Sequence, residues 1–103
     1  MWQSKEIRFA PDHPTAAGHF PSRPIIPGVL LLDEALKHAL AGMEGQGDIV
    51  VRAAKFHRPV RPGDAVVIRW EAQPSRIVKF ECRLVDGDSL VASGTIEAPA
   101  DPR

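Results

Sequence analysis

The sequence has very little cysteine and no long apolar run, and both shortages narrow what the protein can be. Cys82 is the single cysteine among 103 residues, so no disulfide can form within the chain, and a reducing compartment is favoured. No segment approaches the roughly 20 apolar residues of a membrane-spanning helix. The first ten residues also lack the apolar core of a secretory signal. We therefore expect a cytoplasmic protein of the bacterial type that does not enter a membrane.

Net charge is absent as well. Thirteen basic residues balance thirteen acidic ones, so nothing favours general attraction to nucleic acid or to a membrane surface. A chain of this length is expected to form one domain, residues 1–103, with a modest core.

Alternating and helical patterns predict an α+β domain. The helix is expected from Gly28 to about Met43. About five strands are expected, at residues 5–10, 48–60, 65–73, 77–85 and 89–98. Four of them follow one another closely, separated by the turn "RPGD" and by Asp86-Gly87, which predicts consecutive hairpins. The expected fold is an antiparallel sheet with one helix packed on its face.

Two carboxylates follow the helix start, and a helical projection separates them. The projection places Val29, Leu32, Leu36, Ala39, Leu40 and Met43 on one stripe, which should face the sheet. Glu34 falls nearly opposite this stripe, within i,i+4 reach of His38, and should be solvated. Leu30 and Leu31 project off the stripe and need another apolar cover.

Asp33 lies at the edge of the predicted stripe, where partial burial would raise the pKa of its carboxyl group. Such a group is a candidate general acid. Two simpler interpretations stay open: a boundary residue that points to water, and a charge in the first turn that complements the helix dipole.

The helix start is a second candidate feature. Pro27 precedes Gly28, so the backbone N–H groups of Gly28 and Val29 should be free to bind a carbonyl oxygen or an oxyanion. A Pro-Gly helix start that binds nothing is the alternative.

The four histidines, at positions 13, 19, 38 and 57, fit no compact metal-binding spacing, so no metal site is predicted. His38 and His57 are expected to be structural. His19 lies just before a proline-rich loop and is a candidate base, because a neutral imidazole accepts protons near neutral pH.

Together, these residues form the segment "GHFPSRPIIPGVLLLDEAL" (18–36), which resembles the signature of the 3-hydroxyacyl-[acyl-carrier-protein] dehydratases of the hot-dog fold. The signature joins a Gly-His-Phe-Pro loop to a Pro-Gly helix start, with an acidic residue fourteen places after the histidine. "KFHRPVRPGD" (55–64) is similar to a second recurrent segment of that family.

The resemblance implies dehydration of a 3-hydroxyacyl thioester to the trans-2-enoyl thioester, with no cofactor beyond the phosphopantetheine arm that carries the substrate. It implies that Gly28 binds the carbonyl oxygen, that His19 removes the C2 proton and that Asp33 protonates the leaving hydroxyl. It also implies a role in fatty acid biosynthesis, an acyl-carrier protein as partner, and a homodimer or a larger assembly of dimers, with His and acid from different subunits.

Two other functions remain open on the sequence: a hot-dog thioesterase, and a non-catalytic subunit that binds acyl thioesters or acts as a scaffold. Lys55, Arg58 and Arg61 form a small basic cluster that could dock an acidic carrier protein. The alternative for this cluster is a solvated strand end.

Overall fold

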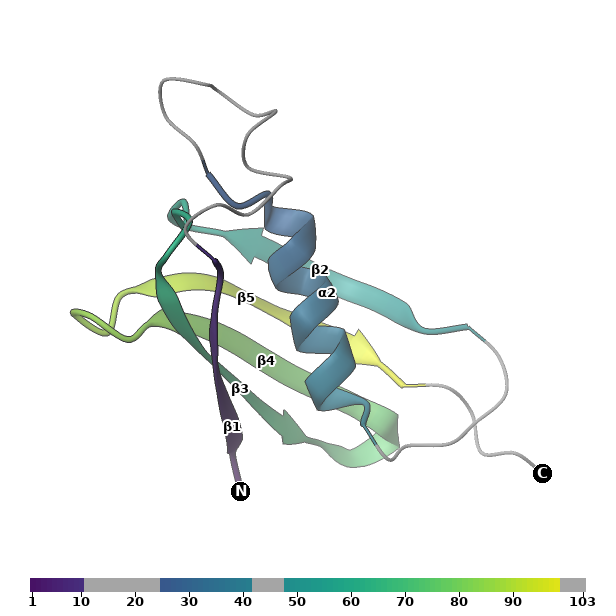
Figure 1. The fold of residues 1–103 in the computed structure, drawn as a ribbon. Helices are drawn as coiled ribbons and strands as arrows, with labels where there is room; N and C mark the ends of the chain where they lie inside the picture. The colour runs from purple at the N-terminus through teal and green to yellow at the C-terminus, as the bar shows by residue number, and fades with distance from the viewer. Residues whose placement is uncertain (11–24, 42–47, 99–103) are drawn as a thin grey trace.

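In the part of the chain that the structure describes, five strands form one antiparallel sheet, and one α-helix lies against one of its faces (Figure 1). A computed structural model describes residues 1–10, 25–41 and 48–98. The elements are β1 (Gln3–Arg8), α2 (Gly28–Ala39), β2 (Val50–Phe56), β3 (Ala65–Ala72), the short 3-10 turn η1 (Pro74–Arg76), β4 (Ile77–Leu84) and β5 (Leu90–Glu97). Among the described residues, no helix is both long and apolar enough to cross a membrane.

The strands bury one face because their apolar residues alternate with polar ones. Ile68 of β3, Cys82 of β4 and Ala92 of β5 are direct cross-strand neighbours, and all three are buried beneath the helix. Alternate residues of β3 and β4 point inward, as expected for the alternating segments 65–73 and 77–85: Val66, Ile68, Val78, Phe80 and Cys82 are buried, and Trp70 packs against them. The alternation rule therefore predicted the core face of the sheet correctly.

The order of the strands differs from the predicted run of hairpins. The sheet has the order β1-β3-β4-β5-β2, so β2 pairs with β5 at one edge and is not the partner of β3. The Arg-Pro-Gly-Asp turn is a real turn, with Gly63 at φ 92° and the Asp64 carboxylate accepting a hydrogen bond from the Arg61 N–H at 2.9 Å. It starts a connection to the far side of the sheet, and β2 is left as an edge strand.

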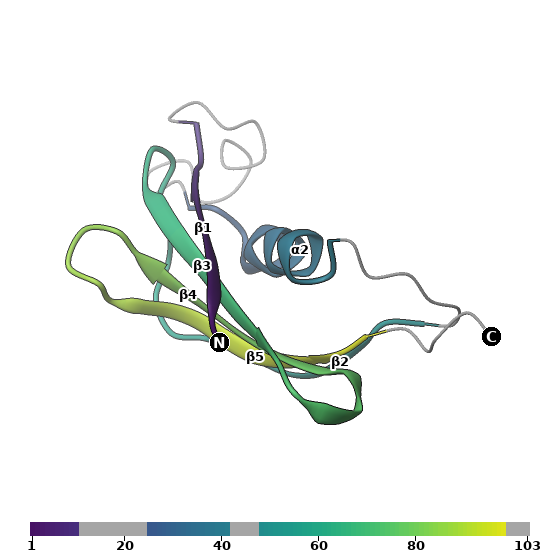
Figure 2. The ribbon, with the colours of Figure 1, turned by 90° about the horizontal axis from the view of Figure 1, so that it is seen from below.

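Helix α2 sits in the hollow of the curved sheet (Figure 2). The face that meets the sheet agrees with the predicted stripe only in part: Ala39 is buried as predicted, but Leu31, which was predicted to lie off the stripe, is buried too. Leu31, Ala35 and Ala39 are buried, whereas Val29, which the projection placed in the core, is 66% exposed. The predicted stripe and the actual one overlap, because Leu32, Leu36 and Leu40 pack at the side of the core. The helix also ends earlier than predicted, at Ala39; Met43 lies outside the described residues.

Cys82 is expected to be chemically inert in the folded protein. Burial raises the pKa of its thiol to about 12, and the neighbouring Glu81 carboxylate contributes a smaller increase. At pH 8 the reactive thiolate should be about a thousandfold scarcer than for an exposed cysteine with a pKa of about 8.5. Folding should also become less favourable as the pH rises from about 8.5, where the unfolded thiol ionises, towards 12. Titration with an aromatic disulfide reagent tests this: the thiol should react only after denaturation, and fast reaction of the native protein would contradict it.

Candidate active site

The start of helix α2 is fixed by a short bridge to the segment after β2. The Ile26 N–H donates to the Val60 carbonyl at 2.7 Å, and both side chains are buried. Pro27 then occupies the N-cap position, and no side chain of the described residues caps the helix. The first turn also contains no acidic residue. The positive end of the helix dipole at Gly28 and Val29 is therefore not neutralised by this part of the chain, which agrees with the predicted carbonyl-binding role without testing it.

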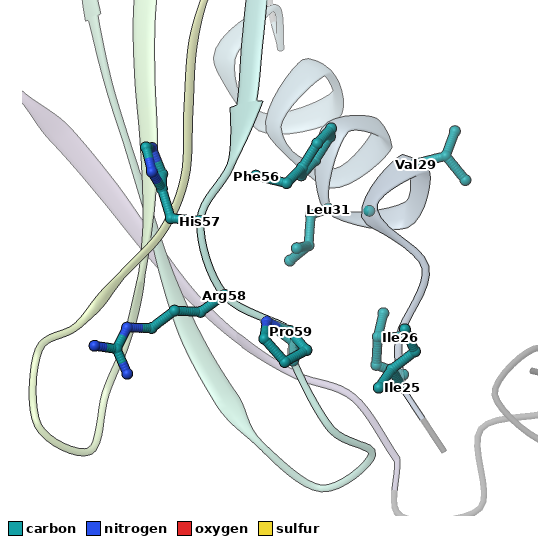
Figure 3. A pocket seen from close by; sticks show the side chains of 10 residues that line it. Ile25, Ile26, Val29, Leu31, Phe56, His57, Arg58 and Pro59 are labelled. Atoms are coloured by element: carbon teal, nitrogen blue, oxygen red, sulfur yellow. The ribbon is translucent and has the colours of Figure 1, made fainter. Parts of the chain in front are cut away.

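A pocket of about 490 Å³ opens beside this helix start (Figure 3). Its lining comes from the helix entry, the first helical turn and the end of β2: Ile25, Ile26, Gly28, Val29, Leu31, Phe56, His57, Arg58, Pro59 and Val60. The side chains of His57 and Arg58 point away from the helix, whereas Phe56 and Leu31 lie between the helix and the end of β2, and Ile25 and Ile26 lie on the helix entry across from Pro59. The pocket is therefore apolar inside, with a volume in the range of small-molecule sites.

Phe56 lies directly over Gly28. A Cβ atom added to Gly28 would stand 3.0 Å from both Cδ1 and Cε1 of the Phe56 ring, closer than most real contacts. The absence of a side chain at Gly28 thus lets the ring of the edge strand approach the helix backbone. Phe56 belongs to the segment "KFHRPVRPGD" (55–64), but the sequence alone predicted no role for it. An aromatic residue at the end of a predicted strand is visible in the sequence. Its contact with Gly28 becomes visible only in the three-dimensional fold.

The structure places Asp33 differently from the prediction. Its side chain is exposed on the side of α2 away from the sheet, so this chain alone does not bury it against the core. Asp33 follows Val29 by four residues, one turn further along the same helix face. Val29 in turn lines the pocket. The candidate acid therefore lies one turn from the pocket, on a face that another molecule would have to cover to exclude water.

Glu34 has structural contacts of its own. Its carboxylate is 3.4 Å from His38 Nε2, the predicted i,i+4 contact, and its side chain is 28% exposed, less than the solvated position that was predicted. His38 stacks on Trp70 with ring centroids 6.2 Å apart. Glu34 and His38 therefore connect the helix to β3, which confirms a structural role for His38.

The structure describes some of the remaining histidines and basic residues, but not all of them. His19 and His13 lie outside the described residues. His57 has its Nε2 atom 3.3 Å from Ser93 Oγ on the sheet face opposite the helix, a structural contact as expected. Lys55, Arg58 and Arg61 are all exposed and form no ion pair with the described residues. Within the described residues, no group of three His, Cys, Asp or Glu side chains could hold a metal ion.

Comparison with known proteins places this geometry in a family. The sequence profile of the ApeI-like family, ApeI dehydratase, matches residues 3–95. The 3-hydroxyacyl-[acyl-carrier-protein] dehydratase FabZ of Wolbachia sp. subsp. Brugia malayi is 32% identical over 91% of this chain and 72% of that protein. FabZ of Agrobacterium fabrum is 35% identical over 88% of this chain and 66% of that protein. The chain thus spans about two thirds of the length of these relatives.

A solved structure supports the fold. The dehydratase heterocomplex ApeI:P from Xenorhabdus doucetiae superposes with a TM-score of 0.76 at 22% identity, over 93% of this chain and 85% of that one. One helix over a curved antiparallel sheet is the arrangement of the hot-dog fold. The chain belongs to the ApeI-like dehydratase family.

This membership confirms the predicted family resemblance and the predicted fold class. The relatives named above are hydro-lyases, which is the predicted enzyme class. Their names also favour dehydration over the two alternatives, thioester hydrolysis and a non-catalytic scaffold.

Proposed function

We propose that this chain removes water from a 3-hydroxyacyl thioester and forms the trans-2-enoyl thioester. His19 accepts the C2 proton, and the electrons of that C–H bond form the C2=C3 double bond. The C3–O bond breaks, and the proton of Asp33 goes to the departing oxygen, so that water leaves. The Gly28 N–H, at the positive end of α2, binds the thioester carbonyl oxygen and stabilises the negative charge that develops there.

The exposed carboxyl of Asp33, one turn beyond the uncapped start of the helix, is the observation that carries this proposal. An elimination of this kind needs an acid, a base and a stabilised carbonyl oxygen, and no metal or redox cofactor. The chain supplies two of these three parts within one and a half turns of a single helix. The apolar pocket beside Gly28 provides space for the substrate.

The complete site requires a second subunit in this proposal. Asp33 is exposed, and so are several apolar residues of the helix start and of the β2 region: Val29, Ile49, Val50, Val51 and Phe56. Most of these lie on or just before β2, an edge strand whose outer side pairs with no described strand. Pairing of β2 with its copy across a two-fold axis would satisfy this edge and cover the helix face. The proposed occupant is a second copy of this chain. Pairing with a different subunit, in a heterocomplex such as ApeI:P, is the alternative outcome.

The substrate is delivered by an acyl-carrier protein in this proposal. Lys55, Arg58 and Arg61 are exposed near the end of β2, where they would attract the acidic surface of a carrier or the phosphate of its pantetheine arm. The reaction would serve fatty acid biosynthesis in a reducing cytoplasm, where the buried Cys82 stays reduced.

A spectroscopic assay tests the proposal. The protein is incubated with a 3-hydroxyacyl thioester of an acyl-carrier protein, in the presence of EDTA, and both enoyl absorbance and free thiol are recorded. Enoyl absorbance should rise without release of thiol. Release of thiol would mean that the protein is a thioesterase, and no change in either signal would support a binding subunit and contradict the proposal.

A further inference from the structure

Phe56 has an unusual position for a large apolar side chain. Phe56 is 51% exposed, although it is the last residue of β2, which belongs to the sheet that carries the core. One side of its ring, at Cδ1 and Cε1, lies against Gly28, where an added Cβ would be 3.0 Å away. The remainder of the ring borders the pocket and the open edge of the sheet. Within one subunit, the described residues therefore support the ring on one side only.

The chemistry of the pocket indicates what it accepts. Ile26, Leu31 and Val60 form a buried apolar floor, and Ile25, Pro59 and the Phe56 ring surround it. No carboxylate lines the pocket among the described residues, and the guanidinium of Arg58 points away from it (Figure 3). Such a surface suits an aliphatic chain, because it offers contact area but no partner for a charged or strongly polar group.

The pocket also has the correct position for such a chain. It is continuous with the backbone of Gly28, and its rim at Val29 is one helical turn from Asp33. A thioester whose carbonyl oxygen is bound at Gly28 would therefore have its reacting carbons near Asp33 and its hydrocarbon tail within reach of Phe56.

From this geometry we infer that Phe56 determines acyl-chain specificity, because its ring forms the wall that limits how much of the hydrocarbon tail the pocket can hold. The inference rests on the proposed function for the identity of the substrate. Short chains gain contact with the ring, and long chains must displace it. Phe56 touches neither acid nor base in this arrangement, so its replacement changes the selection of substrate more than the chemistry.

Replacement of Phe56 by Ala tests the inference through a ratio of rates. The specificity constant kcat/KM is measured for 3-hydroxybutanoyl, 3-hydroxyoctanoyl and 3-hydroxydodecanoyl thioesters. The ratio of the dodecanoyl to the butanoyl value should rise by about tenfold, the usual effect of a few methylene contacts in an apolar pocket. Phe56→Leu, which keeps an apolar side chain and protects folding, should shift the ratio in the same direction by a smaller factor.

Trp2→Ala is the matched control. It removes another partly exposed ring, which stacks over Arg69 at 5.0 Å and does not line the pocket beside Gly28. The ratio of the dodecanoyl to the butanoyl kcat/KM should be the same in Trp2→Ala as in the unchanged protein. An equal fall in kcat/KM for all three chain lengths in both Phe56 variants would overturn the inference while leaving dehydration established.

Binding of saturated acyl thioesters separates the inference from the proposed function. These ligands lack the 3-hydroxyl group and cannot be dehydrated, so calorimetry reports the fit of the chain alone. If Phe56→Ala shifts the preference towards longer chains in a protein that forms no enoyl product, the inference stands and the proposed reaction fails. If dehydration proceeds but the chain-length preference for binding is unchanged, the inference fails alone.

Discussion

Replacement of Asp33 by Asn is expected to lower kcat/KM for dehydration by about a thousandfold, the contribution of a well-placed general acid. The amide has nearly the shape of the carboxylic acid but cannot donate a proton to the departing hydroxyl. Because Asp33 is exposed and makes no hydrogen bond or ion pair with the described residues, the change should leave the melting temperature nearly the same. Enoyl formation and thermal unfolding, measured on the same preparation, give both results.

Glu34→Gln is the control that the chain itself supplies. Glu34 is the adjacent carboxylate, but it pairs with His38 and lies on the side of the helix that approaches β3. Its replacement should therefore keep most of the activity and cost at most about 1 kcal/mol of stability, as for other partly exposed ion pairs. Full activity in Asp33→Asn, or loss of activity in Glu34→Gln alone, would show that the acid has been assigned to the wrong residue.

Replacement of Gly94 by Ala is expected to have the largest effect on stability. A Cβ atom at this position would stand only 2.3 Å from the Ala53 carbonyl oxygen and 2.6 Å from two atoms of the Phe80 ring. The carbonyl belongs to the backbone of β2, so relief of the contact requires the β2–β5 pairing to separate. We expect a loss of about 3 kcal/mol, which for a domain of this size lowers the melting temperature by about 15 °C.

Ser93→Thr is the matched change, since it adds one methyl group to the neighbouring residue of β5, on the outward face. It should alter the melting temperature by only about 2 °C, because threonine suits a strand well. If the Gly94→Ala variant has the same melting temperature as the unchanged protein, β2 cannot be packed against β5 as closely as the structure places it.

The strands were predictable from the sequence, but their order was not. Alternation of apolar and polar residues in 65–73 and 77–85 is a local property, and it identified the buried residues of β3 and β4. Strand order depends on which pairs of strands meet, and the turn around Gly63 is compatible with either a hairpin or a longer connection. The structure shows the longer connection, with β2 at the edge beside β5, a pairing of segments that are distant in the sequence.

The helix begins where the sequence predicted it, but it is rotated about its axis, so that a partly different face meets the sheet. Six of its residues between Val29 and Leu40 are valine or leucine, and they surround much of the helix. A projection cannot then decide which apolar face meets its own sheet. The structure assigns Leu31 and Ala35 to the core and leaves Val29 exposed. The face that was predicted to be buried is in part the face that a second subunit is proposed to cover.

The candidate site, like the helix, was predictable only in part from the sequence. The spacing from His19 to Asp33 and the Pro-Gly helix start are properties of the sequence, and they indicated Gly28 and Asp33 as candidate residues whose roles stay predictions. The role of Phe56 depends on a contact between segments that are 28 positions apart in the chain, so no local pattern could reveal it. The position of His19 lies outside the described residues and stays a prediction.

Mixing two inactive variants tests the central claim, that His19 and Asp33 from different subunits complete one dehydration site. His19→Ala and Asp33→Asn are prepared separately, and then unfolded and refolded together with an equal amount of each. Half of the dimers formed at random contain both chains, and each of these has one intact site of two, so about a quarter of the original enoyl-forming activity should return. If the mixture stays as inactive as the separate variants although mixed dimers form, the two residues do not share a site between subunits.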